Sequence, residues 1–265
     1  MSPRSLAAIP WDFETFPEFL AARRGRLGIN AGFYVGHSNV RRWVMGEDAN
    51  QREATEDEIE AMRRIVAEAV AAGAAGFSSS HAPTHRDSFD RPIPSRLSSP
   101  HELEVLVAEV GRANRGSISY LPYGSIGGLG EDDEALLIRL ALASRLPIII
   151  QGLGARSKVD APTAAWPHSR GYLDRCREAG AAVYSMLMAK PFNRTFPLAE
   201  GTSLYEGVPA FHRLFTEART VAERVAMLRD PAYRESIRSA VENPNRDASR
   251  GSTLPVSSGA TSPRT

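Results

Sequence analysis

A histidine and two arginines directly follow an apolar, aromatic segment, where they could act as a base, a metal ligand or an anion-binding pair. They are His37, Arg41 and Arg42. Histidine serves as a general base or ligand near neutral pH, and arginine binds carboxylates in bidentate fashion. The sequence predicts His37 as a catalytic candidate and Arg41 as a substrate-binding candidate. The plainer alternative is that His37 caps the next turn and that one arginine pairs with a surface carboxylate, Glu47 or Asp48.

A second cluster combines a serine triplet with two histidines. The triplet 78–80 precedes His81 and His85. Histidines four residues apart share one face of a helix, as metal sites require, but Pro83 lies between these two and argues against a helix. No glycine elbow surrounds the serines, so a polar strand exit is the simpler interpretation. His85 is the second catalytic candidate, and a metal-independent hydrolase using the serines with His81 or His85 is a further alternative.

Other polar groups follow later apolar segments. Tyr120 and Tyr123 precede the glycine-rich segment 124–130, which has no lysine-serine or lysine-threonine pair and so does not fit a phosphate-binding loop. The next two exits carry Gln151, Gly152, Lys190, Asn193 and Arg194. We predict Arg194 as the second substrate-binding candidate. The remaining histidines and the cysteine fall on helical patterns and are interpreted as structural or surface groups: His101, His168, His212 and Cys176.

The elements that must position these groups alternate between strands and helices. Predicted strands begin near residues 28, 74, 117, 147 and 182, with helices at 56–72, about 100–112, from 132 or 133, and 167–179. Thr55 with Glu58 fits a capping box, and Ser99 with Glu102 is interpreted in the same way. Five βα units predict a parallel sheet, either open and doubly wound or part of a closed barrel. In both, reactive groups lie past the carboxyl ends of the strands.

The chain is predicted to hold an incomplete barrel. A complete (β/α)₈ barrel needs about 250 residues, whereas the sequence after Met188 predicts only short helices at 209–215, 221–229 and 231–241. The fold class is therefore α/β, a partial (β/α)₈ barrel of five units with C-terminal helices. We expect a flexible segment 1–9, one barrel-type domain over 10–241 and a disordered tail over 242–265, where Asn, Pro, Ser, Arg, Gly and Thr dominate.

Composition excludes several classes of function. The net charge of +1 over 265 residues gives no electrostatic case for nucleic acid or anionic membrane. A single cysteine excludes an intrachain disulfide and a multi-cysteine zinc site. No apolar run is long enough to cross a membrane, and the N-terminus is too weak for a secretory signal. The sequence thus predicts a cytoplasmic protein.

Several segments, taken in order, resemble the N-acyl-D-amino-acid deacylases, the D-aminoacylase-like branch of the amidohydrolase superfamily. The resemblance runs over most of residues 10–242. It is carried by segments 10–16 (PWDFETF), 35–46 (VGHSNVRRWVMG), 54–59 (ATEDEI), 73–78 (GAAGFS), 94–96 (PSR), 193–196 (NRTF) and 204–209 (LYEGVP).

The resemblance implies a zinc-dependent (β/α)₈ barrel that hydrolyses an N-acyl amino acid or related amide, with an aspartate shuttling the proton. The five strands would correspond to its third to seventh. The HxH motif of the first strand and the aspartate of the last have no counterpart here. The positions expected to hold two further histidines are Tyr120 and Gly152, so no metal ligand is identified.

These departures predict an inactive or impaired chain, either from a divergent subgroup with a reduced metal site or from a lineage that has lost metal chemistry. The abrupt change of composition in the tail adds the hypothesis of a truncated or frameshifted reading frame. The alternative is a non-catalytic, barrel-derived binding protein. An open barrel would also expose apolar strand edges, which predicts self-association. A clean monomer with a sharp cooperative melt would contradict that expectation.

Overall fold

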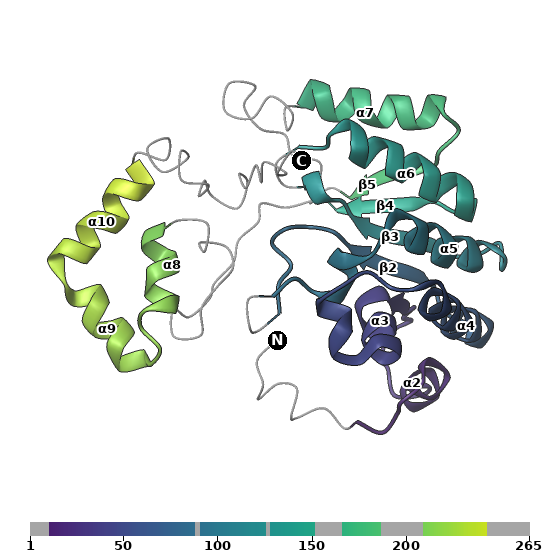
Figure 1. Cartoon of the computed structure of the whole chain (residues 1–265), viewed down its shortest axis with the longest axis horizontal. Helices are drawn as coiled ribbons and strands as arrows, with labels where there is room; N and C mark the ends of the chain where they lie inside the picture. Colours follow the sequence, from purple (N-terminus) through teal and green to yellow (C-terminus); the bar gives the residue numbers. More distant parts are fainter. Residues whose placement is uncertain (1–10, 88–90, 126–127, 152–165, 187–208, 243–265) are drawn as a thin grey trace.

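The computed structural model describes residues 11–87, 91–125, 128–151, 166–186 and 209–242, and its centre is a parallel sheet (Figure 1). The strands are β1 (Tyr34–Gly36), β2 (Gly76–Ser80), β3 (Ser117–Leu121), β4 (Ile148–Gln151) and β5 (Val183–Met186). They lie in chain order, and every neighbouring pair is parallel. A doubly wound sheet would reverse its strand order at a switch point. The sequential order therefore selects the partial-barrel alternative.

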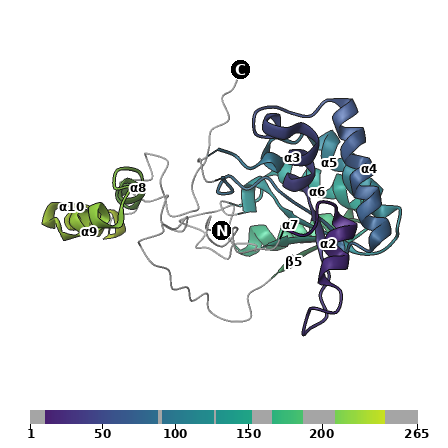
Figure 2. The same ribbon diagram turned by 90° about the horizontal axis from the view of Figure 1, so that it is seen from below.

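The helices that connect the strands cover one face of the sheet. They are α3 (His37–Met45), α4 (Glu56–Ala72), α5 (Pro100–Gly111), α6 (Glu131–Ser144) and α7 (Trp166–Glu178). A further helix, α2 (Phe16–Arg23), precedes β1. Helix α4 packs on α5, α5 on α6 and α6 on α7, as Figure 1 shows, while α2 lies against α4 (Figure 2). Right-handed crossovers between strands in sequential order place all the connecting helices on the same face of the sheet.

The two faces of the sheet differ because side chains alternate along each strand. One row in register is apolar and buried: Val35, Phe77, Ile118, Ile148 and Val183. It faces the helices and forms the core. The next row is half-buried or exposed and begins with small and hydroxyl residues: Gly36, Ser78, Ser119, Ile149 and Tyr184. In a closed barrel this second face would line the interior.

Local sequence signals set most of the element boundaries. Helix α4 matches the predicted 56–72, begins with the capping box of Thr55 and Glu58, and ends at Gly73 in the left-handed region with φ +110°. The first strand begins later than the predicted residue 28, because pairing with β2 covers only 34–36. The apolar pattern of the sequence extends back to residue 28. A strand also needs a hydrogen-bonded partner, and β2 begins only at Gly76, opposite Tyr34.

Both outer strands of the arc have a free edge in the described structure. β1 pairs only with β2, and β5 pairs only with β4. Tyr184 and Met186 on β5 are exposed, at 61% and 58%. Unpaired edges of this kind template contacts with other chains. Self-association through these edges stays a prediction.

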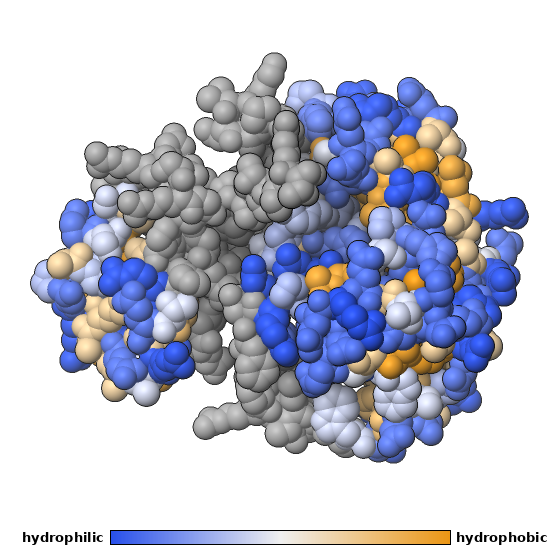
Figure 3. Space-filling model, viewed as in Figure 1, coloured by the Kyte–Doolittle hydropathy of each residue, from blue (hydrophilic) through white to orange (hydrophobic). Residues whose placement is uncertain are grey.

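The predicted C-terminal helices are confirmed as α8 (Pro209–Thr216), α9 (Val221–Arg229) and α10 (Pro231–Glu242), which pack on one another. The predicted flexible start and disordered tail fall almost wholly outside the described residues. Figure 3 shows mainly hydrophilic residues over the coloured surface, with smaller hydrophobic patches between them. Among the helices that the structure describes, none has the length and hydropathy to span a membrane.

Candidate functional site

The carboxyl ends of β1 to β4 meet at one edge of the arc, and a cavity of about 250 Å³ lies there. The residues that follow β1 and β2 therefore come together, as the parallel topology predicts. The cavity is lined by Gly36, His37, Ser38, Ser78, Ser79, Ser80, His85, Ile93, Ser95, Ser119, Tyr120, Leu121 and Gln151. Hydroxyl groups dominate this lining, and none of the described residues in it carries a carboxylate.

His37 lies outside the reach of solvent, at the first position of α3. Its Nε2 is 2.6 Å from Oε1 of Glu102, and its Nδ1 is 2.8 Å from Oγ of Ser79. A carboxylate only accepts, so we assign the proton to Nε2, and the Ser79 hydroxyl donates to Nδ1. Burial lowers the pKa of His37 below its ordinary value, against the opposing effect of Glu102. His37 is therefore neutral at pH 7, and its side chain has no exposed surface.

Arg41 completes this buried network. Its guanidinium donates to the second oxygen of Glu102 and, at 2.9 Å, to the carbonyl oxygen of Arg52. Both charged side chains of the pair are fully buried, so in this structure Arg41 has no surface to offer a substrate. Arg42 forms an exposed ion pair with Glu47, which confirms the plainer alternative for that residue.

Glu102 was predicted as the closing residue of a capping box, and that prediction is wrong. Ser99 does cap α5, since its hydroxyl accepts from the N–H of Glu102 at 3.1 Å. The carboxylate, however, points into the protein and joins His37 to Arg41. Burial raises the pKa of Glu102, but hydrogen bonds and charge from His37 and Arg41 outweigh it and hold the pKa below the ordinary value. The spacing of Ser99 and Glu102 is typical of a solvent-exposed helix cap, but here the glutamate is a buried charged group.

His81 is likewise engaged at both ring nitrogens. Nε2 lies 2.8 Å from Oγ of Ser98, whose own proton goes to the carbonyl oxygen of Ser95, so Nε2 carries the proton. Nδ1 then accepts from the hydroxyl of Tyr120 at 2.9 Å. Burial, with a smaller effect of His37, lowers the pKa of His81 to about 4.

Lowering the pH from about 7 to about 5 should destabilise the protein through these neutral histidines. The folded pKa values of His37 and His81 lie below the ordinary 6.5, so the unfolded chain takes up protons first. The stability that these neutral histidines contribute is fully present above pH 6.5. It is lost as the pH falls toward their pKa values in the folded protein. Urea unfolding at each pH should show a loss of about 2 kcal/mol over this range. A pH-independent midpoint would contradict this account of the network.

His85 is the one predicted site histidine with a nitrogen that is free within the described chain. Its Nδ1 lies 2.8 Å from Oγ of Ser80, while Nε2 makes no hydrogen bond there. The imidazole is half-buried at the cavity, and burial, with Arg96 as a further cause, lowers its pKa.

The serine triplet is divided between these histidines. Ser79 bonds His37, Ser80 bonds His85, and Ser78 donates to the carbonyl oxygen of Val35 at 3.4 Å. The order Ser79, His37, Glu102 matches the nucleophile, base and acid of a hydrolytic triad. Base and acid are both fully buried, and the acid is also neutralised by Arg41, so this chain of hydrogen bonds is a structural link between β2, α3 and α5.

The residues that the structure describes do not fit a zinc site. No group of three His, Cys, Asp or Glu side chains comes close enough there to hold a metal. Tyr120, at one position where the resemblance implies a histidine, is buried and bonded to His81, and burial raises the pKa of its phenol. It stays protonated and is a poor zinc ligand. Gly152 and Arg194 lie outside the described residues.

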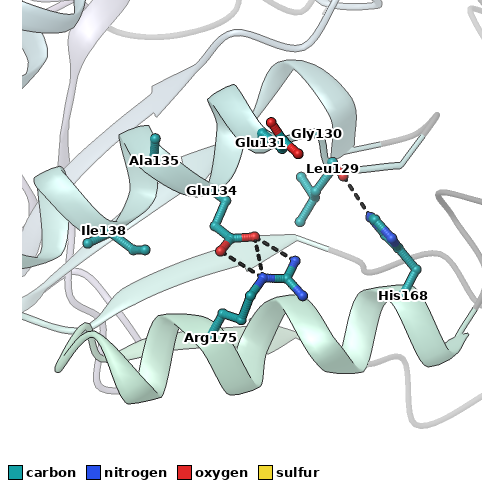
Figure 4. A pocket seen from close by; sticks show the side chains of 8 residues that line it. All are labelled: Leu129, Gly130, Glu131, Glu134, Ala135, Ile138, His168 and Arg175. Atoms are coloured by element: carbon teal, nitrogen blue, oxygen red, sulfur yellow. Dashed lines mark hydrogen bonds and ion pairs between the residues drawn. The ribbon is translucent and has the colours of Figure 1, made fainter.

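Cys176 and His168 have structural roles. Cys176 is buried, and burial raises the pKa of its thiol to about 11. A separate surface cavity of about 540 Å³ lies between α6 and α7 (Figure 4). There Glu134 and Arg175 neutralise each other in a bidentate pair, and His168 donates to the carbonyl oxygen of Leu129 at 2.9 Å. These interactions tie α7 to α6, and Arg175, the one arginine among the described lining residues, is neutralised by Glu134.

Fold and site together define a class: a singly wound arc of a (β/α) barrel whose inner face carries a hydroxyl-lined cavity at its mouth. No family model matches the chain. A D-aminoacylase from Alcaligenes xylosoxydans xylosoxydans is 46% identical to it over 67 residues, which make up 25% of this chain and 13% of that protein. The predicted resemblance to the D-aminoacylases is thereby confirmed.

Solved structures of the same group share the fold. A crystal structure of D-aminoacylase, described as defining a novel subset of amidohydrolases, superposes with a TM-score of 0.50 and 22% identity, covering 65% of this chain and 33% of that one. The N-acyl-D-glutamate deacylase of Bordetella bronchiseptica was solved in complex with zinc and a phosphonate mimic of the tetrahedral intermediate. It superposes with a TM-score of 0.50 and 24% identity, covering 65% of this chain and 34% of that one. The chain thus matches about a third of the length of these enzymes.

Proposed function

We propose that this chain is the substrate-binding wall of an N-acyl-D-amino-acid deacylase-type amidohydrolase, and that by itself it binds N-acyl amino acids without hydrolysing them. The observation that carries the proposal is the mouth cavity on the inner face of a D-aminoacylase-like arc. Strand exits at this edge are where barrel enzymes hold their substrates. Ser78 and Ser119 lie side by side in register on β2 and β3 and offer hydroxyl groups to an amide.

The absence of turnover follows from the chemistry of the described side chains. Hydrolysis of an amide by this class relies on a metal that activates water and polarises the carbonyl. Both nitrogens of His37 and both of His81 are already engaged by protein partners. Taking either as a ligand would break a buried network, so no step through zinc is derived for this chain.

Metal analysis combined with an amidase assay tests this proposal. We expect the purified chain to hold substoichiometric zinc and to release no more acetate from N-acetyl-D-amino acids than buffer does, with or without added zinc. The same sample should bind those compounds, which separates it from an inert fold. Stoichiometric zinc, together with hydrolysis that a chelator abolishes, would contradict the proposal and support an active enzyme.

A further inference from the structure

Arg96 is a half-buried cation at the mouth of the arc that the prediction of site residues missed. It lies on the 3₁₀ helix Pro94–Leu97, and its Nη1 is 3.4 Å from the carbonyl oxygen of His85. No carboxylate of the described chain pairs with it. Burial, with the neighbouring charge of Arg86, lowers its pKa. A partly desolvated guanidinium is stabilised by an anion, and among the described residues no carboxylate is paired with Arg96.

The hydrogen-bond network gives His85 a free donor at the same place. Ser80 is buried, its Oγ accepts from the N–H of Ala82 at 3.2 Å, and its own proton has His85 Nδ1 as the acceptor at 2.8 Å. The imidazole is thus the tautomer protonated at Nε2. This N–H has no acceptor in the described structure. His85 lines the cavity, and Arg96, which contacts the backbone carbonyl of His85, adds a positive charge beside it.

The surroundings favour a small carboxylate over other ligands. The cavity of about 250 Å³ is smaller than typical drug-sized sites, and the described residues that line it include no acidic side chain. Glu102, the nearest buried carboxylate of the network, is already held by His37 and Arg41. Planar carboxylates match the fork of an arginine, and an N–H from imidazole can share the same anion.

We propose that Arg96 and the Nε2–H of His85 bind the carboxylate of the N-acyl amino acid, with its amide lying along the hydroxyls of Ser78 and Ser119. This assignment rests on the proposed function. It makes Arg96 and His85 specificity-determining residues, which select an acylated amino acid over an acylated amine or amide that lacks the carboxylate.

Two probes that differ only in charge test the assignment: N-acetylglycine and its neutral counterpart N-acetylglycinamide. Calorimetric titration of the whole chain should show at least about a tenfold preference for the acid, which corresponds to about 1.4 kcal/mol. Arg96→Gln should reduce the preference to within about twofold, and His85→Gln should weaken it by about threefold to tenfold. Arg139→Gln, which removes an exposed arginine paired with Glu104 on the helix side, should leave it unchanged.

The possible results are distinguishable. A preference that persists in a folded Arg96→Gln variant places the carboxylate elsewhere and overturns this assignment, while the proposed function stands. Binding of neither probe to the unmodified chain overturns both. If Arg96→Gln does not fold, the unmodified chain tests the assignment through the pKa of His85, measured from its imidazole NMR signals. N-acetylglycine should raise this pKa, and N-acetylglycinamide should not. Equal effects of the two probes would overturn the assignment.

Discussion

Replacing Glu102 by glutamine should destabilise the protein by about 3–5 kcal/mol, because it leaves the Arg41 charge buried without its counter-ion. Both side chains of this pair have no exposed surface, and Nε of Arg41 already lacks a hydrogen-bond partner among the described residues. Glutamine keeps the shape of the side chain but offers one acceptor where the carboxylate offers two, so the loss combines the missing charge with one hydrogen bond to His37 or Arg41. Chemical unfolding followed by circular dichroism gives the free energy directly.

A matched control lies on the same helix. Glu104 forms an ion pair with Arg139 whose side chains are 33% and 49% exposed. Glu104→Gln should change the free energy of unfolding by no more than about 0.5 kcal/mol, since exposed pairs contribute little. A cost below about 1 kcal/mol for Glu102→Gln would show that solvent reaches the network, and the structural role assigned to His37 and Arg41 would fail.

Replacing Gly76 by alanine should cost about 4 kcal/mol, because backbone and space both oppose a side chain at the start of β2. The residue has φ +150°, and a Cβ there would lie 1.9 Å from the carbonyl oxygen of Ser117 and 2.7 Å from Cε1 of Tyr34. Relief of the first contact would push β2 away from β3 at the centre of the arc. Thermal unfolding and the yield of folded protein measure the effect.

Gly73 provides the comparison that separates the two causes. It also has positive φ, at +110°, but a Cβ there would meet nothing within 4 Å. Gly73→Ala should therefore cost only the conformational penalty of about 1–2 kcal/mol. Similar losses in the two variants would contradict the close strand approach described at Gly76.

Residue patterns predicted the architecture because the signals that determine it are local. The three-to-four spacing of Ile59, Met62 and Val66 defines α4, and its boundaries follow from a cap and a glycine. Sequential βα units then predicted parallel strands. The choice between an open sheet and a barrel depended on strand order, which no local pattern contains.

The candidate site was predicted only in part, for a related reason. His37 and His85 were selected as strand-exit histidines, and both do line the mouth cavity. Whether such a histidine binds a ligand or only links structural elements depends on its burial and on its hydrogen-bond partners. Both are set by residues far away in the sequence. Glu102 meets His37 across 65 positions and was mistaken for a cap. Arg96 follows no predicted strand end, so no strand-exit pattern indicates it.

The most direct measurement observes binding and turnover in one NMR sample of the purified chain with an N-acetyl-D-amino acid. Saturation transfer from protein to the acetyl methyl group reports binding, and free acetate reports hydrolysis. We predict saturation transfer to a ligand that stays intact throughout the incubation. Accumulation of acetate that stops when a chelator is added, or no saturation transfer at all, would contradict the account.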